Sequence, residues 1–378
     1  MEHYDVVVLG TGGVGSAAAY HAALRGAKVL GLDRFTPAHD RGSSHGATRI
    51  IRQAYYEHPD YVPLAERAFK AWAELEARCG ERLYHQTGLL EVGPSDGEVL
   101  AGVRASARMH DLDIEELPAG QVMARWPGFA VPDDLAGVFE PRAGFLRVEE
   151  CVLAHQEEAR RLGARLESET AVESWRAEGR GVRVVAGRPV SAAALIITAG
   201  AWAASVLADL GLPLLVRRKS VFWYRQRGEQ YSAAAGCPCY LFELPQGIFY
   251  GVPSIDGWGV KAAEHSGGAS VEDPLAVSRQ VDPVEQRRVE DFLAAHLPQA
   301  VPPFSRHSVC MYTMTPDSHF IVDRHPAWPQ VVFAAGLSGH GFKFTGVLGQ
   351  ALVELALDGK TSLPVAFLAC GRPALRSG

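Results

Sequence analysis

The strand-loop-helix signature at the N-terminus constrains the fold of this 378-residue chain more than any other stretch. An apolar run from Val6 to Leu9 is followed by Gly10, Gly12 and Gly15 in GxGxxG spacing, and then by an alanine-rich helical segment. A continuous apolar run is typical of a buried parallel strand. The first glycine permits a tight turn, the second lets the backbone approach a pyrophosphate, and the third lets the helix pack closely on the strand.

An acidic residue completes this pattern. A second apolar strand is expected from Lys28 to Leu32, and it is followed by Asp33, whose carboxylate can accept hydrogen bonds from an adenosine ribose. An acid at this position disfavours a ribose 2′-phosphate, so NAD or FAD is favoured over NADP. Two later glycine pairs lack the third glycine of the motif. The sequence therefore predicts one dinucleotide site, and these residues alone leave NAD and FAD open.

Composition excludes several other classes of protein. Hydrophobic residues make up 47% and charged residues 21% of the chain, as in ordinary globular proteins. The formal net charge is −6 and the densest basic cluster covers only residues 217–219, so no nucleic-acid partner is expected. The most apolar region, 192–216, is broken by glycine and aspartate, so no membrane span is expected. The six cysteines lack paired spacing and indicate neither a metal site nor a disulfide framework.

Six further stretches, taken together, resemble the monomeric sarcosine oxidases and N-methyltryptophan oxidases, a family of FAD-dependent amine oxidases. They are GSSHGATRIIRQAY (42–55), YVPLAERAFKAW (61–72), ARWPGFAVPDD (124–134), GIFYGVPS (247–254), VCMYT (309–313) and GLSGHGFKF (336–344). They occur in order over nearly the whole chain, so an accidental match is not expected. The resemblance implies FAD as the cofactor, an N-methyl (secondary) amino acid as the substrate, oxygen as the acceptor and hydrogen peroxide as a product.

The resemblance also implies the architecture. It predicts an α/β fold in which a Rossmann-like FAD-binding domain is interwoven with a second, α+β substrate domain built on a large, mainly antiparallel sheet. The FAD-binding domain is expected to comprise residues 1–82, 145–215 and 310–378, and the substrate domain residues 83–144 and 216–309. A monomer is expected from the family. The cytoplasm is expected because the N-terminus lacks the charge pattern of a signal peptide.

Cys310 of the VCMYT stretch is the residue that the resemblance assigns to covalent flavin attachment. Judged alone, a single cysteine in an apolar stretch is more often a small core residue than a reactive one. In the family the matching cysteine forms a thioether with the flavin 8α-methyl group, a reaction that suits a thiolate nucleophile. No metal is expected. The other residues expected to contact FAD are Gly10, Gly12, Gly13, Gly15, Asp33, Arg34, Ser43, His45, Thr48, Arg49, Val172, Gly200, Gly339, Gly341 and Lys343.

Lys261 is the residue expected to activate oxygen. The stretch around it predicts two strands joined by a turn, and the alternation of the second strand places Lys261, Ala263 and His265 on one face. From spacing alone, a solvated face is the simpler interpretation. The resemblance places the lysine over the flavin ring, where a positive charge would stabilise superoxide. His265 and Arg49 are expected to add to this positive field, and Tyr250 matches an active-site tyrosine.

Arg52 and Lys343 match the residues that hold the substrate carboxylate in the family. A guanidinium suits this role because it binds a carboxylate through two parallel hydrogen bonds. An ordinary surface ion pair is the alternative for Arg52. Tyr312 and His340 match two further active-site positions, and for His340 the alternative is a histidine that is hydrogen-bonded within its own loop.

The chain departs from the family pattern beside the expected flavin. Ser44 and Ala47 stand where relatives usually have a histidine and an acid, and Gln53 stands where they have a histidine. Loss of the acid is expected to make the local field more positive, and leaves flavin attachment and substrate preference open. N-methyltryptophan oxidation and oxidation of proline or pipecolate are alternatives. A flavin dehydrogenase with another acceptor, an NAD-dependent dehydrogenase and a non-catalytic flavin-binding protein also stay open.

Overall fold

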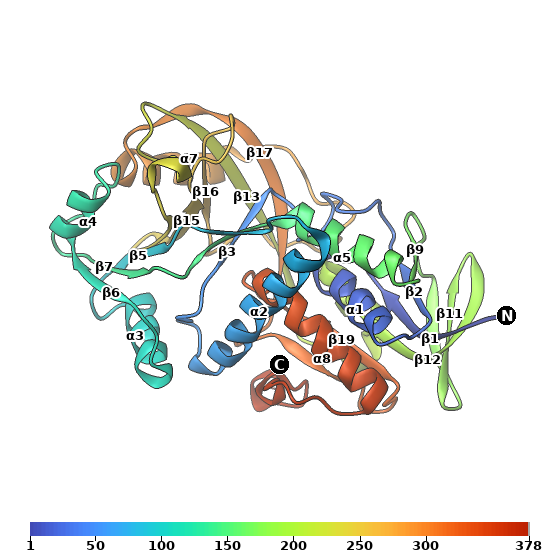
Figure 1. The fold of residues 1–378 in the computed structure, drawn as a ribbon. Coiled ribbons are helices and arrows are strands. Elements are labelled where there is room, and N and C mark those ends of the chain that lie inside the picture. The colour runs from blue at the N-terminus through green and yellow to red at the C-terminus, as the bar shows by residue number, and fades with distance from the viewer. Residues whose placement is uncertain (377–378) are drawn as a thin grey trace.

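The N-terminal strand-loop-helix forms the centre of the first β-sheet in the computed structural model, which describes residues 1–376 (Figure 1). β1 (Glu2–Leu9) pairs in parallel with β2 (Val29–Leu32) on one side and with β12 (Arg188–Ile197) on the other. β9 (Arg165–Glu167) continues the parallel pairing beyond β2, and β19 (Val331–Ala335) pairs in parallel with β12. The predicted Rossmann-like arrangement is therefore confirmed.

Short antiparallel strands complete this sheet, and three helices cover one face of it. The added strands are β10 (Ser174–Glu178), β11 (Gly181–Ala186) and β18 (Ile321–Arg324). The helices are α1 (Gly13–Leu24), α5 (Val148–Arg161) and α8 (Thr345–Asp358), with α1 in contact with both others (Figure 1). α2 (Val62–Cys79) packs outside α5 and α8.

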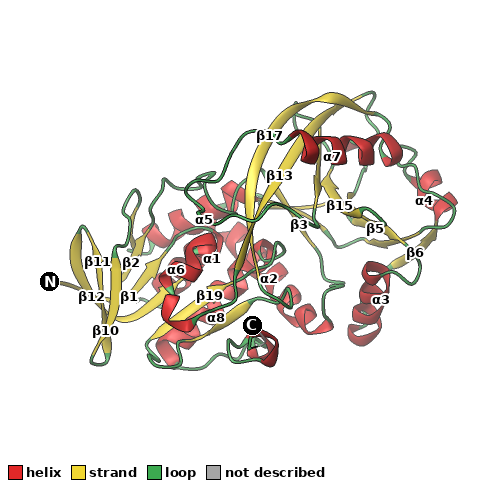
Figure 2. Ribbon diagram, turned by 180° about the vertical axis from the view of Figure 1, so that it is seen from behind, coloured by secondary structure: helices red, strands yellow, loops and turns green. Residues whose placement is uncertain are grey.

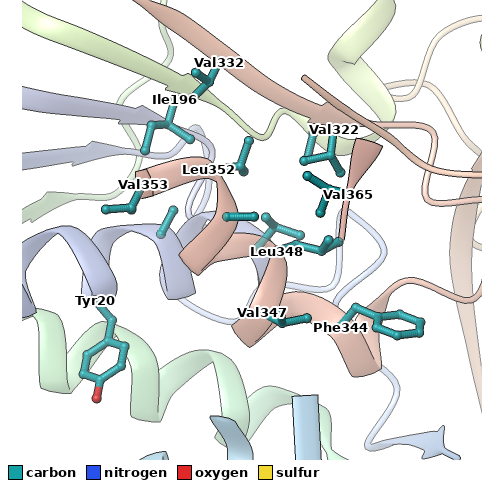
Figure 3. Close-up of a cluster of buried hydrophobic side chains, with 14 of the residues drawn as sticks. Tyr20, Ile196, Val322, Val332, Phe344, Val347, Leu348, Leu352, Val353 and Val365 are labelled. Atoms are coloured by element: carbon teal, nitrogen blue, oxygen red, sulfur yellow. The ribbon is translucent and has the colours of Figure 1, made fainter. Parts of the chain in front are cut away.

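The interface between these helices and the sheet is a dry core. Leu348, Leu352 and Val353 of α8 pack against Ile196 of β12 and Val332 of β19 (Figure 3). Burial of each such side chain stabilises the fold by about 1.5–3 kcal/mol. This core places α1 and its preceding glycine loop firmly above the ends of the central strands.

The second sheet forms a roof over the first and, like it, has eight strands, in the order β17-β13-β16-β15-β14-β5-β7-β6. All its neighbouring strands are antiparallel except β14 and β5, so the predicted mainly antiparallel sheet is confirmed. α7 (Pro283–His296) covers one face (Figure 2). The strands are β5 (Leu89–Gly93), β6 (Glu115–Pro118), β7 (Ala136–Glu140), β13 (Leu215–Gln226), β14 (Cys239–Leu244), β15 (Gly247–Val252), β16 (Val260–Glu264) and β17 (Ala300–Met314).

A small third sheet joins the two larger ones. β8 (Gly144–Arg147) lies between β3 (Thr48–Ile51) and β4 (Tyr84–Gln86). The remaining helices are α3 (Glu98–His110), α4 (Ala119–Arg125), α6 (Ala203–Val206) and short 3₁₀ turns that include η1 (Pro59–Tyr61), η2 (Gly200–Trp202) and η5 (Phe342–Phe344). The division into two domains at the expected boundaries stays a prediction. No helix within residues 1–376 is both long and apolar enough to cross a membrane.

Candidate active site

A cavity of about 600 Å³ lies where β1, β2 and β12 of the first sheet end. The carboxyl ends of parallel strands are the usual ligand-binding edge of such a sheet. Most of the residues predicted to contact a dinucleotide line this cavity. They are Gly10, Gly12, Gly13, Asp33, Arg34, Ser43, Arg49, Val172, Gly200, Gly339 and Gly341.

The glycine loop has the geometry that close approach of a dinucleotide requires. A Cβ atom on Gly15 would lie 1.8 Å from the carbonyl oxygen of Gly10, so only glycine lets α1 pack this closely. Asp33 is fixed at the end of β2 because its carboxylate accepts hydrogen bonds from the backbone N–H groups of Thr11 (2.7 Å) and Phe35 (3.0 Å). The N-terminus of α1 carries no acidic side chain and faces the cavity. These residues fit an adenine dinucleotide.

Ser44 lies directly against this glycine loop. Its hydroxyl oxygen accepts a hydrogen bond of 3.0 Å from the backbone N–H of Gly13. Because that N–H belongs to the first turn of α1, the serine satisfies one of the orphan donors of the helix N-terminus. The departure from the family pattern at Ser44 therefore changes the polar lining of the dinucleotide cavity.

Cys310 lies on β17 next to two basic side chains. Its Sγ atom is 3.2 Å from Nη2 of Arg49 and 3.9 Å from Nδ1 of His45. Burial opposes ionisation of the thiol, but the neighbouring His45 and Arg49, together with Lys261, lower the pKa of Cys310 to about 6. A thiol with this pKa is mainly thiolate at neutral pH, and the thiolate is the nucleophilic form.

Lys261 is buried, so the solvated-face interpretation is wrong. Its Nζ atom donates hydrogen bonds to the carbonyl oxygens of Gly46 (2.7 Å) and Thr48 (2.8 Å). Burial, followed by the charge of Arg49, holds the pKa of Lys261 well below its usual value. The lysine is thus tied to the same 42–49 loop that contacts Cys310.

The loop beside Ala47 still has a carboxylate, and it comes from another part of the chain. Glu149, in the first turn of α5, accepts hydrogen bonds from the backbone N–H groups of Gly46 (2.7 Å) and Ala47 (3.1 and 3.2 Å). The loop therefore still contacts an acid although position 47 is an alanine. The negative charge of Glu149 counteracts the more positive field that the alanine led us to expect.

A smaller cavity of about 60 Å³ lies beside the large one. It brings together the residues that the sequence predicted for catalysis and substrate binding, apart from Lys261. They come from β3, β15 and β17, from the positions directly after β3 and β16, and from the loop and 3₁₀ turn before α8. These are Arg49, Arg52, Tyr250, His265, Tyr312, His340 and Lys343. The two cavities have Arg49, Tyr312, Gly339 and Phe342 in common.

Arg52 is already paired in this structure. Its Nη2 atom donates to both oxygens of Glu57 at 2.6 and 2.8 Å, and its guanidinium lies 4.3 and 4.5 Å from the ring centres of Tyr55 and Tyr56. Burial favours the neutral acid, but Arg52, with His340 and Lys343, lowers the pKa of Glu57 to about 2. The pair is buried and lines the cavity, so the alternative interpretation of Arg52 as part of an ordinary surface ion pair is wrong.

His340 and Lys343 are held by a tyrosine. Lys343 donates from Nζ to the carbonyl oxygen of His340 (2.9 Å) and to the hydroxyl of Tyr55 (3.3 Å), and burial with the charge of Arg52 lowers its pKa to about 7. The imidazole of His340 lies between the Tyr55 hydroxyl (2.6 Å) and the Ser318 carbonyl oxygen (2.9 Å). Burial lowers the pKa of His340 to about 4, so this histidine is neutral. It both lines the cavity and is hydrogen-bonded in place.

His265 adds no positive charge at neutral pH, and that expectation was wrong. Burial, followed by the nearby charge of Lys219, lowers the pKa of its imidazole to about 3. Its Nδ1 atom lies 3.4 Å from the hydroxyl oxygen of Tyr312. The ring of Tyr250 packs edge-on at 6.1 Å. His265 is therefore a neutral hydrogen-bonding group in an aromatic wall, and the strong positive charge between the cavities comes from Arg49.

Three acidic residues of the site were not predicted. Glu57 follows Arg52 by five residues, and this opposite-charge spacing within one loop could have suggested a pair. Glu91 is a single acid inside the apolar run LLEVG, which is a signal because an acid is almost never fully buried without a partner. No local pattern marks Glu149, which is about a hundred residues from the loop that it contacts.

A dinucleotide cavity in a Rossmann-like sheet, roofed by a second sheet that carries a lysine and a reactive cysteine, defines a flavin-binding oxidoreductase. The chain matches the family described as FAD dependent oxidoreductase over residues 5–355 and belongs to that family. FAD is thus its cofactor, and the NAD-dependent alternative is set aside.

Individual relatives narrow the class to flavin-dependent amine oxidases. The chain is 41% identical to a monomeric sarcosine oxidase of Streptomyces avermitilis, over 96% of each protein. It is 39% identical to the monomeric sarcosine oxidase of Bacillus sp. (strain B-0618), over 99% of this chain and 97% of that protein. It is 36% identical to an N-methyl-L-tryptophan oxidase of Yersinia pestis (strain Pestoides F), over 98% and 99%.

Solved structures agree on the fold. The structure of NikD, described as an unusual amino acid oxidase essential for nikkomycin biosynthesis, matches with a TM-score of 0.86 at 27% identity and 98% coverage of both chains. L-proline dehydrogenase from P. horikoshii matches with a TM-score of 0.83 at 22% identity, over 97% of each chain, and supports the fold alone.

Proposed function

We propose that this protein oxidises N-methyl amino acids to the demethylated amino acid, formaldehyde and hydrogen peroxide. The observation that carries the proposal is the meeting of two cavities, one fit for FAD and one lined by Arg52 and Lys343. An N-methyl amino acid carries its carboxylate and its secondary amine on the same α-carbon, so two cations that bind the carboxylate beside the flavin site also bring the amine close to that site. The names of the most similar relatives, sarcosine oxidase and N-methyl-L-tryptophan oxidase, support this substrate class.

Arg52 and Lys343 are the proposed carboxylate-binding residues. Because Glu57 occupies the guanidinium of Arg52 at 2.6 and 2.8 Å, a substrate carboxylate has to take its place. An exchange of one carboxylate for another keeps the buried guanidinium paired throughout, which avoids the penalty of an uncompensated charge. The neutral imidazoles of His340 and His265, and the hydroxyls of Tyr250 and Tyr312, then surround the amine.

Bound FAD supplies the oxidising chemistry, since a flavin can accept a hydride equivalent from an amine and pass the electrons to oxygen. Arg49 and Lys261 are the proposed electrostatic partners of this chemistry, because fixed positive groups stabilise negative charge that develops beside them. Burial favours the neutral amine of Lys261, and a neighbouring negative charge would favour its protonated form.

Cys310 is the proposed covalent anchor of the flavin. The thiolate expected from its pKa of about 6 supports a nucleophilic role, and the cysteine is on the strand that leads from the roof sheet to the cavity. A monomer of 40.8 kDa completes the proposal, and the cytoplasmic location stays a prediction.

Two measurements test the proposed function. Acid precipitation of the purified protein should leave flavin absorbance in the washed pellet, and a Cys310→Ser variant should release its flavin to the supernatant. Sarcosine, N-methyltryptophan, proline and pipecolate should then be tested for anaerobic bleaching of the flavin and for peroxide formation in air. Bleaching without peroxide would assign a dehydrogenase, and no bleaching with any secondary amino acid would contradict the proposal.

A Lys261→Met variant tests whether oxygen is the electron acceptor of the reduced flavin. Loss of one preorganised electrostatic donor typically slows a reaction by about 10²–10³-fold. We expect this slowing in reoxidation by oxygen, measured by stopped flow, with a much smaller effect on flavin reduction by substrate. An unchanged oxygen rate would favour the dehydrogenase alternative.

A further inference from the structure

Glu91 is a buried carboxylate that has no hydrogen bond. It lies on β5 with no exposed surface, and neither of its side-chain oxygens has a hydrogen-bond partner among residues 1–376. The closest cationic atom is Nη1 of Arg52, at 3.6 Å. A buried polar group without a hydrogen bond destabilises a fold by about 1–3 kcal/mol. Such a group calls for an explanation in its surroundings.

The register of the roof sheet places Glu91 on the substrate side. Tyr250 of β15 stands opposite Leu241 of β14, and Leu241 stands opposite Glu91 of β5. Residues directly opposite each other on neighbouring strands point to the same face of a sheet. Tyr250 and Leu241 line the smaller cavity, as does Leu89, two residues before Glu91 on the same strand. Glu91 therefore lies on the same face of the sheet as this wall, one strand beyond Leu241, but it is fully buried and does not itself line the cavity.

The groups around Glu91 do not supply its missing hydrogen bonds. Glu140 of β7 accepts hydrogen bonds from the backbone N–H groups of Gln53 (2.8 Å) and Ala54 (2.9 Å). Arg52 donates from its other nitrogen to Glu57, and the 3.6 Å separation from Glu91 exceeds the 2.7–2.9 Å of a charge-assisted hydrogen bond. The opposed residue on β7 is the apolar Val138. Glu91 is therefore a charge partner of Arg52 without a hydrogen bond to it, and its hydrogen-bonding capacity is unused.

We propose that Glu91 is a specificity-determining residue that accepts hydrogen bonds from an ammonium group at the end of the substrate side chain. The proposal rests on the proposed function and narrows its substrate class to N-methyl amino acids with basic side chains. In this arrangement the carboxylate binds Arg52 and Lys343 and fixes one end of the substrate. The substrate side chain then runs along Leu241 toward Glu91. Once that carboxylate has replaced Glu57 on Arg52, Glu57 and Glu91 are left beside one occupied guanidinium, and a substrate ammonium adds a positive charge that favours the ionised form of Glu91.

The pH dependence of this interaction follows from the same surroundings. Burial raises the pKa of Glu91 to about 8, with Arg52 and Lys343 opposing the shift and Glu140 and Glu57 adding to it. Glu91 thus becomes ionised as the pH rises through about 8, while a side-chain ammonium keeps its charge to about pH 10. Preference for an ammonium-bearing substrate should therefore increase between pH 7 and pH 9.

Matched substrate pairs test the proposal. N-methylornithine and N-methylnorleucine have side chains of the same length and differ only in an ammonium or a methyl group at the end. One pair of substrates with shorter side chains and one pair with longer side chains are tested as well, because the side-chain length decides whether its end reaches Glu91. The measurement is the ratio of kcat/KM within each pair, from peroxide formation. A charge-assisted hydrogen bond predicts a ratio of about 10 or more for at least one pair in the wild-type enzyme.

Variants then assign the preference to Glu91. Glu91→Gln should reduce the ratio several-fold and remove its rise between pH 7 and pH 9, and Glu91→Leu should invert the preference toward the methyl-terminated substrate. Flavin content and melting temperature check that each variant is folded. Glu116→Gln is the matched control, because this acid lies on the same sheet but pairs with Arg104 away from the cavity. It should leave the ratio unchanged.

The outcomes separate the two proposals. If sarcosine is oxidised but the wild-type ratio stays near one for every pair, the assignment of Glu91 is wrong and the proposed function stands. The same conclusion follows if Glu91→Leu keeps the wild-type ratio. If no N-methyl amino acid reduces the flavin, the proposed function itself is wrong, and the substrate class built on it falls with it.

Discussion

Arg49 lies beside the Cys310 thiol and, after His45, is the side chain that most lowers the pKa of this cysteine. Its guanidinium lies 3.2 Å from the thiol sulfur and helps to hold the pKa of Cys310 at about 6. In wild-type apoprotein mixed with FAD, we expect the rate of acid-stable flavin formation to rise with pH and to reach half its maximum near pH 6. In Arg49→Met, the midpoint should move up by at least about one pH unit, because removal of a nearby opposite charge raises a thiol pKa. An unchanged midpoint would contradict this electrostatic role.

Under the proposed function, Glu57 competes with the substrate carboxylate for Arg52, because it already pairs with this guanidinium. Methoxyacetate resembles sarcosine but has no titrating amine, so its binding reports on the carboxylate site alone. With Glu57→Gln, we expect its dissociation constant, measured by flavin absorbance, to fall about tenfold, since the charge-assisted pair no longer has to be displaced. Because the pKa of Glu57 is about 2, Glu57 itself stays ionised from pH 6 to pH 9, and any change of the effect over this range comes from Lys343, whose pKa is about 7.

A second loop acid provides the control for Glu57. Asp60 lies in η1, directly after the loop of Glu57, is exposed and approaches His58 at 3.7 Å. Asp60→Asn should leave methoxyacetate binding unchanged. If both variants tighten binding equally, a general loss of negative charge explains the result and direct competition does not.

The sequence predicted the cations of the site better than its acids. Arg52, Lys343 and Lys261 stand in motifs that can be compared with a family, and the structure brings the first two into one cavity. Glu57 and Glu149 act through contacts that the sequence does not record, because a carboxylate can pair with any donor that the fold carries to it. Glu91 was visible as an acid in an apolar strand, but which face it occupies depends on a pairing with β14 that lies 150 residues away.

Among the elements, α1 and α8 depend on a glycine for their close packing. A Cβ on Gly349 of α8 would lie 2.7 Å from Cβ of Ala17 and from the backbone nitrogen of Ala18 in α1. We expect Gly349→Ala to destabilise the protein by about 1–3 kcal/mol, because overpacking forces the two helices apart. Urea unfolding of the purified variant, followed by circular dichroism, measures the change.

Gly120 is the matched control for this helix pair. It also lies inside a helix, α4, but a Cβ there meets no atom within 4 Å. Gly120→Ala should be neutral or stabilising by about 0.5–1 kcal/mol, because alanine is the better helix former. Equal destabilisation by both variants would show that the loss of stability does not come from the α1–α8 contact, since helix propensity alone would favour alanine at both positions.

Some strand pairings could be predicted from the sequence and others could not. The pairing of β1 with β2 follows from one short glycine loop and a right-handed crossover, so local sequence was sufficient. The roof sheet draws β5, β7, β13 and β17 from segments far apart in the chain. Its mainly antiparallel character was expected from the family, but strand order depends on long-range packing that short motifs do not encode.

For the molecule as a whole, Glu91 predicts an unusual pH dependence of stability. Its pKa is raised from about 4.5 in the unfolded chain to about 8 in the fold, so the native state binds a proton that the unfolded state releases. The stabilisation is therefore complete below pH 4.5 and is lost as the pH rises through 8. Between these values it changes by about 1.4 kcal/mol per pH unit.

Glu91→Gln removes this contribution. The difference in unfolding free energy, variant minus wild type, should increase steadily from pH 5 to pH 8, measured by urea unfolding of the flavin-bound proteins without substrate. A difference that stays constant over this range would show that Glu91 is ionised throughout, and that Arg52 outweighs burial.

The two cavities meet at only four residues, Arg49, Tyr312, Gly339 and Phe342. Most of the smaller cavity is therefore built from side chains that the larger one does not use, including Leu89 and Leu241 on neighbouring strands of the roof. If the smaller cavity binds the amine, as proposed, mutations in these strands should alter which amine is accepted without changing the residues that line the larger cavity. Such a separation would let the substrate range change during evolution while the cofactor site stays the same. It makes β5 and β14 the first strands to vary in a directed-evolution library.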